Sequence, residues 1–176
     1  MKVNPDDFTN NAWQGIIDAK DLALTEKHQT LETEHLLLSL LKKNEIAIKA
    51  IERSGGTIRK LITEIEEFIK NQPKMLKAQE SIFFGKNISF SISRAKNIKQ
   101  SFKDDFISSE HLVISLFDDE RVCHRLFEQN QINKNSLLEA INAIRGDKKV
   151  TQKNAENSYE ALQKYGLDLT SAARDG

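Results

Sequence analysis

The stretch SSEHLVISLF at Ser108–Phe117 nearly repeats an earlier one, ETEHLLLSLL at Glu32–Leu41. Both contain the tripeptide Glu-His-Leu, and the two copies of it lie 76 positions apart. Sliding the chain against itself by 76 positions, without a gap, aligns further identical residues: Phe8 with Phe84, Asn11 with Asn87, Ile16 with Ile92, Ser39 with Ser115, Leu61 with Leu137 and Ile65 with Ile141. Two similar amphipathic helices would explain one matching window but not a constant offset. The sequence therefore predicts an internal duplication.

Each copy has apolar residues at helical spacing in four short segments. In the first copy one stripe begins with Ala12, Ile16 and Ala19, and another contains Leu36, Leu37 and Leu40. Thr33 and Ser109 precede the repeated tripeptides and are predicted N-caps. We therefore expect an all-α fold of two tandem four-helix repeats related by a pseudo-two-fold axis, with about eight helices and no sheet. One repeat of about 70 residues has a small core, so the two should pack against each other.

The predicted domain organisation follows from the duplication and from composition. Residues 1–146 form the repeat domain, with repeat 1 at about 8–72 and repeat 2 at about 84–146. The stretch between the repeats, Lys70–Asn87, contains enough apolar residues to lie on the domain. Residues 147–158 have Val150 and Ala155 as their only apolar residues and are a predicted flexible linker. Residues 159–176 begin a further helical segment.

Composition excludes several classes of protein. Lys plus Arg and Asp plus Glu are both 26, so the formal net charge is zero, which argues against a nucleic-acid binder. Cys123 is the single cysteine, which rules out an intramolecular disulfide and suits a reducing compartment. The N-terminus has no secretory signal, and no run of 18 apolar residues could span a membrane. These features predict a cytoplasmic protein without nucleic-acid or membrane partners.

Motifs for catalysis or cofactor binding are missing from the sequence. It contains neither a Walker A motif nor a G-x-G-x-x-G loop, so we expect no nucleotide cofactor and no ATPase activity in this chain. His35 and His111 occupy equivalent positions and could meet across the two-fold axis as metal ligands, but a hydrogen-bonded histidine at the edge of the core explains each more simply. Cys123 and His124 point about 100° apart on a helix and make a poor nucleophile–base pair. We predict no catalytic residue and no metal.

Two phrases resemble a known family. FISSEHL at Phe106–Leu112, carried on a tandem helical repeat, resembles the N-terminal domain of Clp ATPases. YEALQKYGLDLT at Tyr159–Thr170 resembles the segment leading into the first AAA+ module of ClpB-type disaggregases, although the chain stops before any Walker motif. The resemblance implies a substrate-recognition domain for unfolded or aggregated polypeptide. It also implies a homohexameric parent protein that uses ATP and Mg²⁺ and cooperates with an Hsp70-type chaperone system. The alternative is an adaptor-docking N-domain of the ClpA or ClpC type.

The resemblance also indicates candidate site residues. The family associates three polar positions with aggregate handling, and these match Thr9, Asp104 and Glu110. Thr9 could equally be an N-cap, and Glu110 a first-turn acid that suits the helix dipole. We expect an apolar groove between the first helix of each repeat and the capped helix of the second. Its candidate walls are Phe8, Ile88, Ile92, Phe106 and Leu112, with the competing interpretation that most of them are core.

Overall fold

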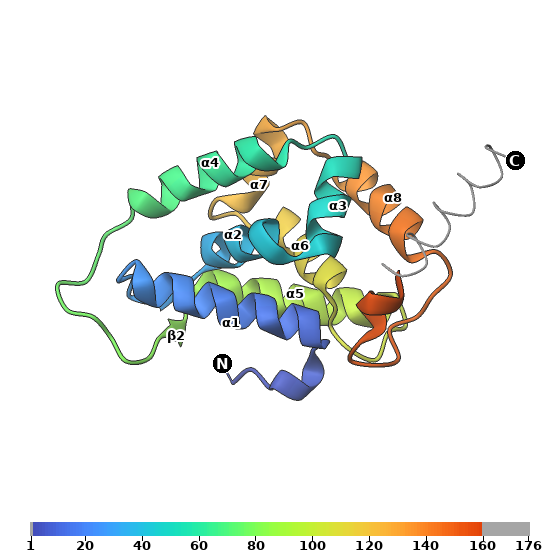
Figure 1. Cartoon of the computed structure of the whole chain (residues 1–176), viewed down its shortest axis with the longest axis horizontal. Helices are drawn as coiled ribbons and strands as arrows, with labels where there is room; N and C mark the ends of the chain where they lie inside the picture. The colour runs from blue at the N-terminus through green and yellow to red at the C-terminus, as the bar shows by residue number, and fades with distance from the viewer. Residues whose placement is uncertain (1, 160–176) are drawn as a thin grey trace, which may run out of the picture.

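The computed structural model describes residues 2–159 and is built mainly from helices (Figure 1). The first repeat contains the 3-10 helix η1 (Pro5–Asp7), α1 (Asn10–Thr25), β1 (Thr30–Leu31), α2 (Thr33–Lys43), α3 (Glu45–Arg53) and α4 (Ile58–Lys70). The second contains β2 (Phe83–Phe84), α5 (Lys86–Ser101), α6 (Ser109–Phe117), α7 (Cys123–Gln129) and α8 (Lys134–Arg145). The prediction of an all-α class with four helices in each repeat is confirmed.

The offset of 76 positions recurs in the backbone. Helices α1 and α5 begin and end 76 positions apart, and α2 and α6, like α4 and α8, begin 76 positions apart. Lys27 and Lys103, which end equivalent turns, both have a φ of 58°. Gly55 and Gln131 are also equivalent and both have positive φ, at 98° and 60°. Because non-glycine residues rarely adopt this conformation, its recurrence at the same offset indicates that the two repeats share one fold.

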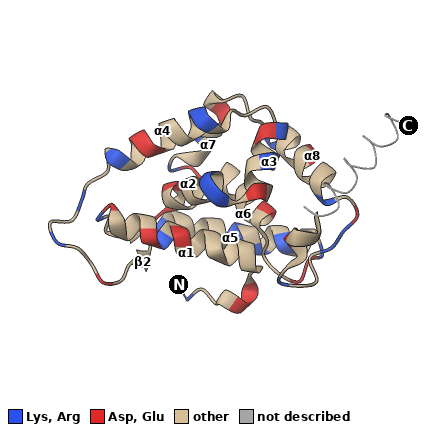
Figure 2. Cartoon of the chain, viewed as in Figure 1, with Lys and Arg blue, Asp and Glu red and all other residues tan. Residues whose placement is uncertain are grey.

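Helices α2 and α6 form the centre of the molecule, with the other helices around them (Figure 1). Every residue of α6 is buried, and so is α2 from Thr33 to Leu41. A helix that is buried on all faces has to satisfy its polar side chains internally. Figure 2 shows charged residues on the outer helices α1, α3 and α4. The two copies of Glu-His-Leu therefore lie inside the core region, and their polar side chains need partners there.

The predicted N-caps are one residue too late. Helix α2 is capped by Glu32 rather than Thr33, and α6 by Ser108 rather than Ser109. In both helices the histidine of the repeated tripeptide accepts a hydrogen bond from the backbone N–H of the capping residue, over 2.9 Å at His35 and 2.8 Å at His111. The repeated histidines therefore close capping boxes, which agrees with the prediction of hydrogen-bonded histidines beside the core.

The prediction of no sheet is wrong, although the sheet is very small. Strands β1 and β2 pair in parallel, with Leu31 opposite Phe84. An isolated bridge joins Phe8 to Ile107, and these two residues are the equivalents of Phe84 and Leu31 in the other repeat. In each repeat, a phenylalanine just before the first long helix (α1 or α5) therefore pairs with the turn that precedes the central helix of the other repeat (α6 or α2). Pairs one or two residues long are too short to show an alternating pattern in the sequence.

The segment between the repeats lies only partly on the domain. Ile82 is buried, and the backbone N–H of Met75 donates to the carbonyl of Lys27 over 2.7 Å. Leu76, by contrast, is fully exposed, and Phe83 is 77% exposed. Figure 1 shows this segment leaving α4 as a loop that swings away from the helices before it returns at β2. The predicted contact with the domain therefore holds at the ends of the segment and not along its length.

The C-terminal stretch 147–159, named here the strap, packs onto both repeats. Val150, Glu156 and Tyr159 on it are each at most 1% exposed. The prediction of a flexible linker at 147–158 rested on its low content of apolar residues. That content carries no information about hydrogen bonds made by the backbone or by a carboxylate. The proposed domain boundaries remain predictions, and apart from Tyr159 the predicted segment 159–176 lies outside the described residues. Among the described residues no helix is long and apolar enough to cross a membrane.

Candidate functional site

Thr9, Asp104 and Glu110 meet at the strap. Thr9 is the N-cap of α1, and its hydroxyl accepts the N–H of Ala12 over 3.2 Å, as the capping alternative predicted. Asp104 lies in the turn between α5 and α6, and Glu110 in the first turn of α6. All three side chains are buried, with at most 6% of any residue exposed. The sequence placed these residues in one region, but they do not form an open surface there.

Asp104 is the most fully bonded carboxylate of this cluster. It accepts two hydrogen bonds of 2.8 Å from the guanidinium of Arg145, one of 2.8 Å from Nε2 of His111, and one of 2.9 Å from the N–H of Val150 on the strap. Burial alone would raise the pKa of Asp104, but the bonds from His111, Arg145 and Val150 outweigh it and hold the pKa well below its usual range. Asp104 is therefore an ionised structural anchor.

His111 completes this network as a neutral ring. Its Nδ1 accepts the N–H of Ser108, so the proton must be on Nε2, which donates to Asp104. Burial lowers the pKa of His111, and the neighbouring Asp104 only partly offsets that effect. His111 therefore connects the cap of α6 to the carboxylate that holds the strap.

Glu110 has a different environment from Asp104. Within the described part of the chain neither of its carboxylate oxygens has a hydrogen-bond partner, and its nearest cation is Nη1 of Arg145 at 3.5 Å. Burial, together with the nearby carboxylate of Glu156, raises the pKa of Glu110 to about 7. A buried carboxyl group without hydrogen bonds is costly when it is ionised. Glu110 is therefore poised to hold a proton near neutral pH.

Glu156 brings the strap to the N-terminal ends of two helices. Its carboxylate accepts hydrogen bonds from the hydroxyl of Thr9, from the N–H of Ser109 over 2.9 Å, and from the hydroxyl of Ser109 over 2.9 Å. Burial raises the pKa of Glu156 despite these bonds. Glu156 is not among the residues predicted from the sequence, because the polar composition of the strap indicates no contacts. An isolated Glu in a polar stretch carries no signal for its partners.

The first repeat has an equivalent arrangement with different partners. Glu34, the counterpart of Glu110, receives two hydrogen bonds from Arg121, of 2.9 and 3.0 Å. His28 replaces Asp104, and its Nδ1 lies 2.7 Å from Nε2 of His35. The less favoured alternative, in which His35 and His111 meet as metal ligands, is not seen, because each ring is hydrogen-bonded within its own repeat. Within the described range no group of three or more His, Cys, Asp or Glu side chains is placed to hold a metal ion.

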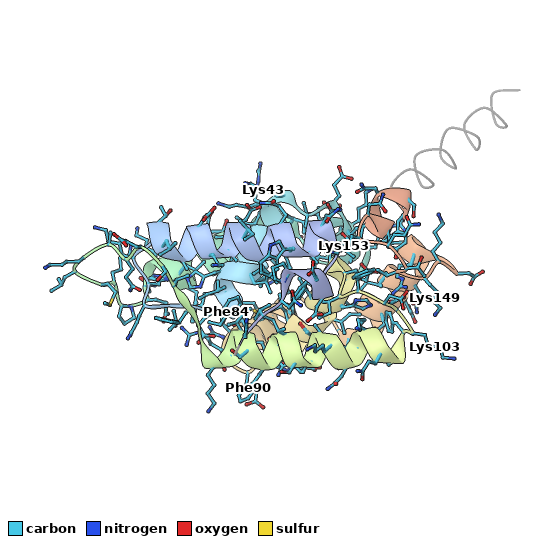
Figure 3. The ribbon with its side chains drawn as sticks, turned by 90° about the horizontal axis from the view of Figure 1, so that it is seen from below. Lys43, Phe84, Phe90, Lys103, Lys149 and Lys153 are labelled. Carbon is cyan, nitrogen blue, oxygen red and sulfur yellow. The ribbon has the colours of Figure 1, made fainter. Side chains whose placement is uncertain are left out.

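The predicted groove walls are mostly core. Phe8, Ile88, Ile92 and Leu112 are each at most 2% exposed, and Phe106 is half-buried against the core. The competing interpretation of these residues therefore holds in this structure. Helical spacing identifies an apolar face but cannot tell whether another element covers it. Figure 3 shows α1 and α5 on opposite sides of the molecule, with other elements and side chains between them.

The pocket between α1 and the turn from α2 to α3 is polar rather than apolar. Its volume is about 230 Å³, and the strap closes one side of it through Asn157. The lining residues are Asn11, Gln14, Gly15, Asp18, Ser39, Lys43, Asn44, Glu45 and Asn157. A pocket rich in amide and charged groups does not suit an apolar segment.

Exposed apolar surface lies elsewhere. Met75, Leu76, Phe83 and Phe90 are the large apolar residues most exposed in the described chain, at 40%, 100%, 77% and 51%. Phe90 lies on the outward side of α5 (Figure 3). It departs from the buried stripe of Ile88 and Ile92, and this is the signal that could have marked it in the sequence. All four residues belong to the segment between the repeats or to the start of α5.

The sequence and the fold have known counterparts. Residues 7–131 match the family model for the Clp repeat (R) N-terminal domain. The whole chain aligns with chaperone protein ClpB from Prochlorococcus marinus at 45% sequence identity, and the alignment covers 20% of that relative's length. An alignment with chloroplastic ClpB2 from Oryza sativa covers 99% of this chain and 18% of the relative, at 39% identity. The chain thus spans about a fifth of these relatives. The Hsp104 N-terminal domain from Candida albicans superposes with a TM-score of 0.77 at 19% identity, over 85% of this chain and 99% of that one, which shows a shared fold.

Proposed function

The chain belongs to the family of Clp repeat N-terminal domains, and from that premise we propose that it is the substrate-recognition domain of an ATP-dependent disaggregase or unfoldase. It would bind exposed hydrophobic segments of unfolded or aggregated proteins and deliver them to a hexameric motor for threading. The motor, its ATP and Mg²⁺ sites and any cooperation with an Hsp70-type chaperone system would reside in sequence outside these 176 residues.

The observation that carries the proposal is the set of exposed apolar side chains at Met75, Leu76, Phe83 and Phe90. Single exposed apolar residues are ordinary on a protein surface. Here, however, all the large ones of the described chain fall within residues 75–90. Apolar side chains that already face water gain free energy when an apolar client segment covers them, without needing a particular sequence. This segment is therefore our preferred client-binding surface.

Weak binding suits such a function. A few partly exposed side chains give a small contact area, and the losses of translational and conformational freedom on association offset much of the gain. A client that is held weakly can be released to a motor. The zero formal net charge of the chain adds no long-range attraction for acidic or basic clients. We also propose that the protein acts in the cytoplasm, whereas relatives from plants include chloroplastic and mitochondrial proteins.

The test is an NMR titration of the chain with a permanently unfolded model protein, such as reduced and carboxymethylated α-lactalbumin. We expect fast-exchange shifts at residues 75–90, and we expect the double variant Phe83→Ser, Phe90→Ser to lose most of them. Ile62→Ser on α4 is the matched control, because it removes a half-buried apolar side chain outside this segment. A charged residue at Ile92 would not serve, since that side chain is buried core and its replacement would test folding.

Three outcomes would contradict the proposal. If the unfolded protein causes no shifts while one folded partner binds tightly, the chain is an adaptor-docking domain of the ClpA or ClpC type instead. If the shifts persist in the double variant, residues 75–90 are not the binding surface. ATP turnover by the chain alone would contradict the assignment as a non-catalytic domain.

A further inference from the structure

The strap is held to both repeats through polar contacts in the interior of the molecule. Its backbone makes hydrogen bonds with residues of both repeats, among them Val150 N–H to Asp104, Asp105 N–H to the Val150 carbonyl, and Asn10 N–H to the Lys153 carbonyl. From this geometry we propose that residues 147–159 form a proton-linked latch, which docks when one proton is held between Glu110 and Glu156 and releases as that proton is lost.

The docking site of Glu156 lies beside Glu110. Ser109, which donates both its N–H and its hydroxyl to Glu156, is the chain neighbour of Glu110. Docking thus brings a second carboxyl group next to one that is fully buried and whose oxygens have no hydrogen-bond partner in the described part of the chain. Two ionised carboxylates in such a setting repel each other strongly, and a shared proton removes the repulsion.

Charge balance supports a bound proton. The carboxylates in the cluster would carry three negative charges if all were ionised, whereas Arg145 supplies one positive charge and is already bonded to Asp104 through both Nη atoms. The neighbouring His111 is neutral by its hydrogen bonds and adds no cation. The titratable and charged groups that act on Glu110 are Arg145 on α8 and Glu156 and Tyr159 on the strap. Asp104, in the turn before α6, bonds to both Arg145 and His111 and so joins the same cluster.

The direction of the pH dependence follows from linkage. Burial of Glu110, together with the carboxylate of Glu156 on the docked strap, raises the pKa of Glu110 to about 7 from an ordinary value of 4.5. Between these two pH values the docked state therefore holds a proton that the released state does not hold. Docking is therefore most favoured at low pH. Its equilibrium constant should fall by up to about tenfold per pH unit between pH 4.5 and about pH 7, and should level off above pH 7, where neither state holds the proton.

Release of the strap would uncover polar groups that it now occupies. The docked strap bonds to the hydroxyl of Thr9, to Oδ1 of Asp104, and to the N–H and hydroxyl of Ser109 in the first turn of α6. Tyr159 packs its ring 5.9 Å from the guanidinium of Arg145, which further encloses the cluster. This inference does not depend on the client-binding surface at residues 75–90 and can be tested without any client.

The experiment measures amide hydrogen exchange by NMR on the whole chain from about pH 5 to about pH 8, a range that covers the rise toward the raised pKa of Glu110 and the plateau above it. The probes are the N–H groups of Asp105, Ser109 and Val150, which bond to or from the strap. Protection factors remove the intrinsic pH dependence of exchange. We expect strap protection to fall by up to about tenfold per pH unit as the pH rises toward 7, and to level off above pH 7, while the amides of α2 and α4 stay protected.

Variants distinguish release of the strap that is linked to loss of a proton from a loss of strap stability that does not depend on Glu110. Glu110→Gln cannot ionise, so the protection of its strap should not change as the pH rises from about 5 to about 8, while the control Glu139→Gln, on an exposed position of α8, should follow the wild type. A wild-type profile in Glu110→Gln would overturn the proposal. If that variant does not fold, the carboxyl ¹³C resonance of Glu110 can be titrated instead. Its midpoint should drop in Glu156→Gln, and an unchanged midpoint would also overturn the proposal.

Discussion

Arg145 and Asp104 form a bidentate ion pair in the interior, with two hydrogen bonds of 2.8 Å and both residues at most 6% exposed. The pair ties the last helix of the second repeat to the turn before its central helix. A second layer of contacts covers it, since the Arg145 guanidinium also lies 5.2 Å from the ring centre of Phe102. Such a pair is costly to break by removing one partner, because the other charge is left buried.

Arg145→Ala is therefore expected to destabilise the chain severely. The free energy of unfolding should fall by about 3–5 kcal/mol, the usual cost of stranding a buried charge. Urea denaturation followed by circular dichroism measures this change. Arg59→Ala, at an exposed position in the first turn of α4, is the control and should stay within about 0.5 kcal/mol of the wild type. Equal effects of the two substitutions would contradict a structural role for the ion pair.

Acid should destabilise the fold through His35. Burial lowers its pKa from 6.5 to about 4, so the unfolded chain takes up a proton that the folded chain refuses. The stability associated with neutral His35 is complete above pH 6.5 and is lost as the pH falls toward 4. The loss is roughly 3 kcal/mol if the whole shift is realised.

Denaturation at several pH values between 7 and 4 tests this expectation. In His35→Asn the stability should vary less with pH over this range than in the wild type, although its stability at pH 7 should be lower because the capping box is lost. His124→Asn is the control, because its side chain is 42% exposed. A wild-type pH slope in His35→Asn would show that another group causes the acid sensitivity.

Gly85→Ala should disrupt a cap that one repeat gives to the other. Glu32 of the first repeat accepts the N–H of Ile88 over 3.0 Å and so caps α5. A Cβ atom at position 85 would lie 1.8 Å from Oε1 of Glu32, so the carboxylate would have to move. We expect a loss of about 1–3 kcal/mol, typical of a buried hydrogen bond to a charged group.

A double-mutant cycle identifies the cause of that loss. In a Glu32→Ala background the carboxylate is already absent, so adding Gly85→Ala should cost much less than it does alone. Thermal and urea denaturation of the four proteins gives the coupling. If the two losses were additive, the clash with Glu32 would not be the reason for glycine at position 85.

Cys123 should be unreactive in the folded chain. The thiol is fully buried, and burial followed by the charge of Asp119 raises its pKa well above the ordinary value. Ellman's reagent should therefore label the native protein only as fast as the chain opens, and should label it at once in denaturant. Rapid labelling without denaturant would show that α7 is not packed as described.

Local sequence patterns predicted much of the fold. The shared tripeptide and the offset of 76 positions predicted two equivalent repeats, and the positive φ of both Lys27 and Lys103 shows that the equivalence extends to single turns. Spacing of apolar residues is a property of one helix, so it can be read without knowledge of the rest. The cap positions were displaced by one residue because Thr33 and Ser109 are also good capping residues in isolation.

The candidate site was predicted less well. Thr9, Asp104 and Glu110 do meet, yet they meet beneath a strap whose Glu156 carried no signal in the sequence. Ile88 and Ile92 have the spacing of a groove wall and are buried, whereas Phe90 lies between them in sequence and is exposed. Whether an apolar face is core or surface depends on which other element covers it, and that element lies far away along the chain.

The sequence by itself determined the duplication, the helical class and the position of each buried stripe, because these depend on residues within a few turns of one another. Only the tertiary structure decided the partners of the polar residues: Glu32 caps the other repeat's helix at Ile88, and Arg145 neutralises Asp104. The physical reason is that a buried charge or an unpaired N–H must find a partner in space. Chain separation places no limit on where that partner comes from.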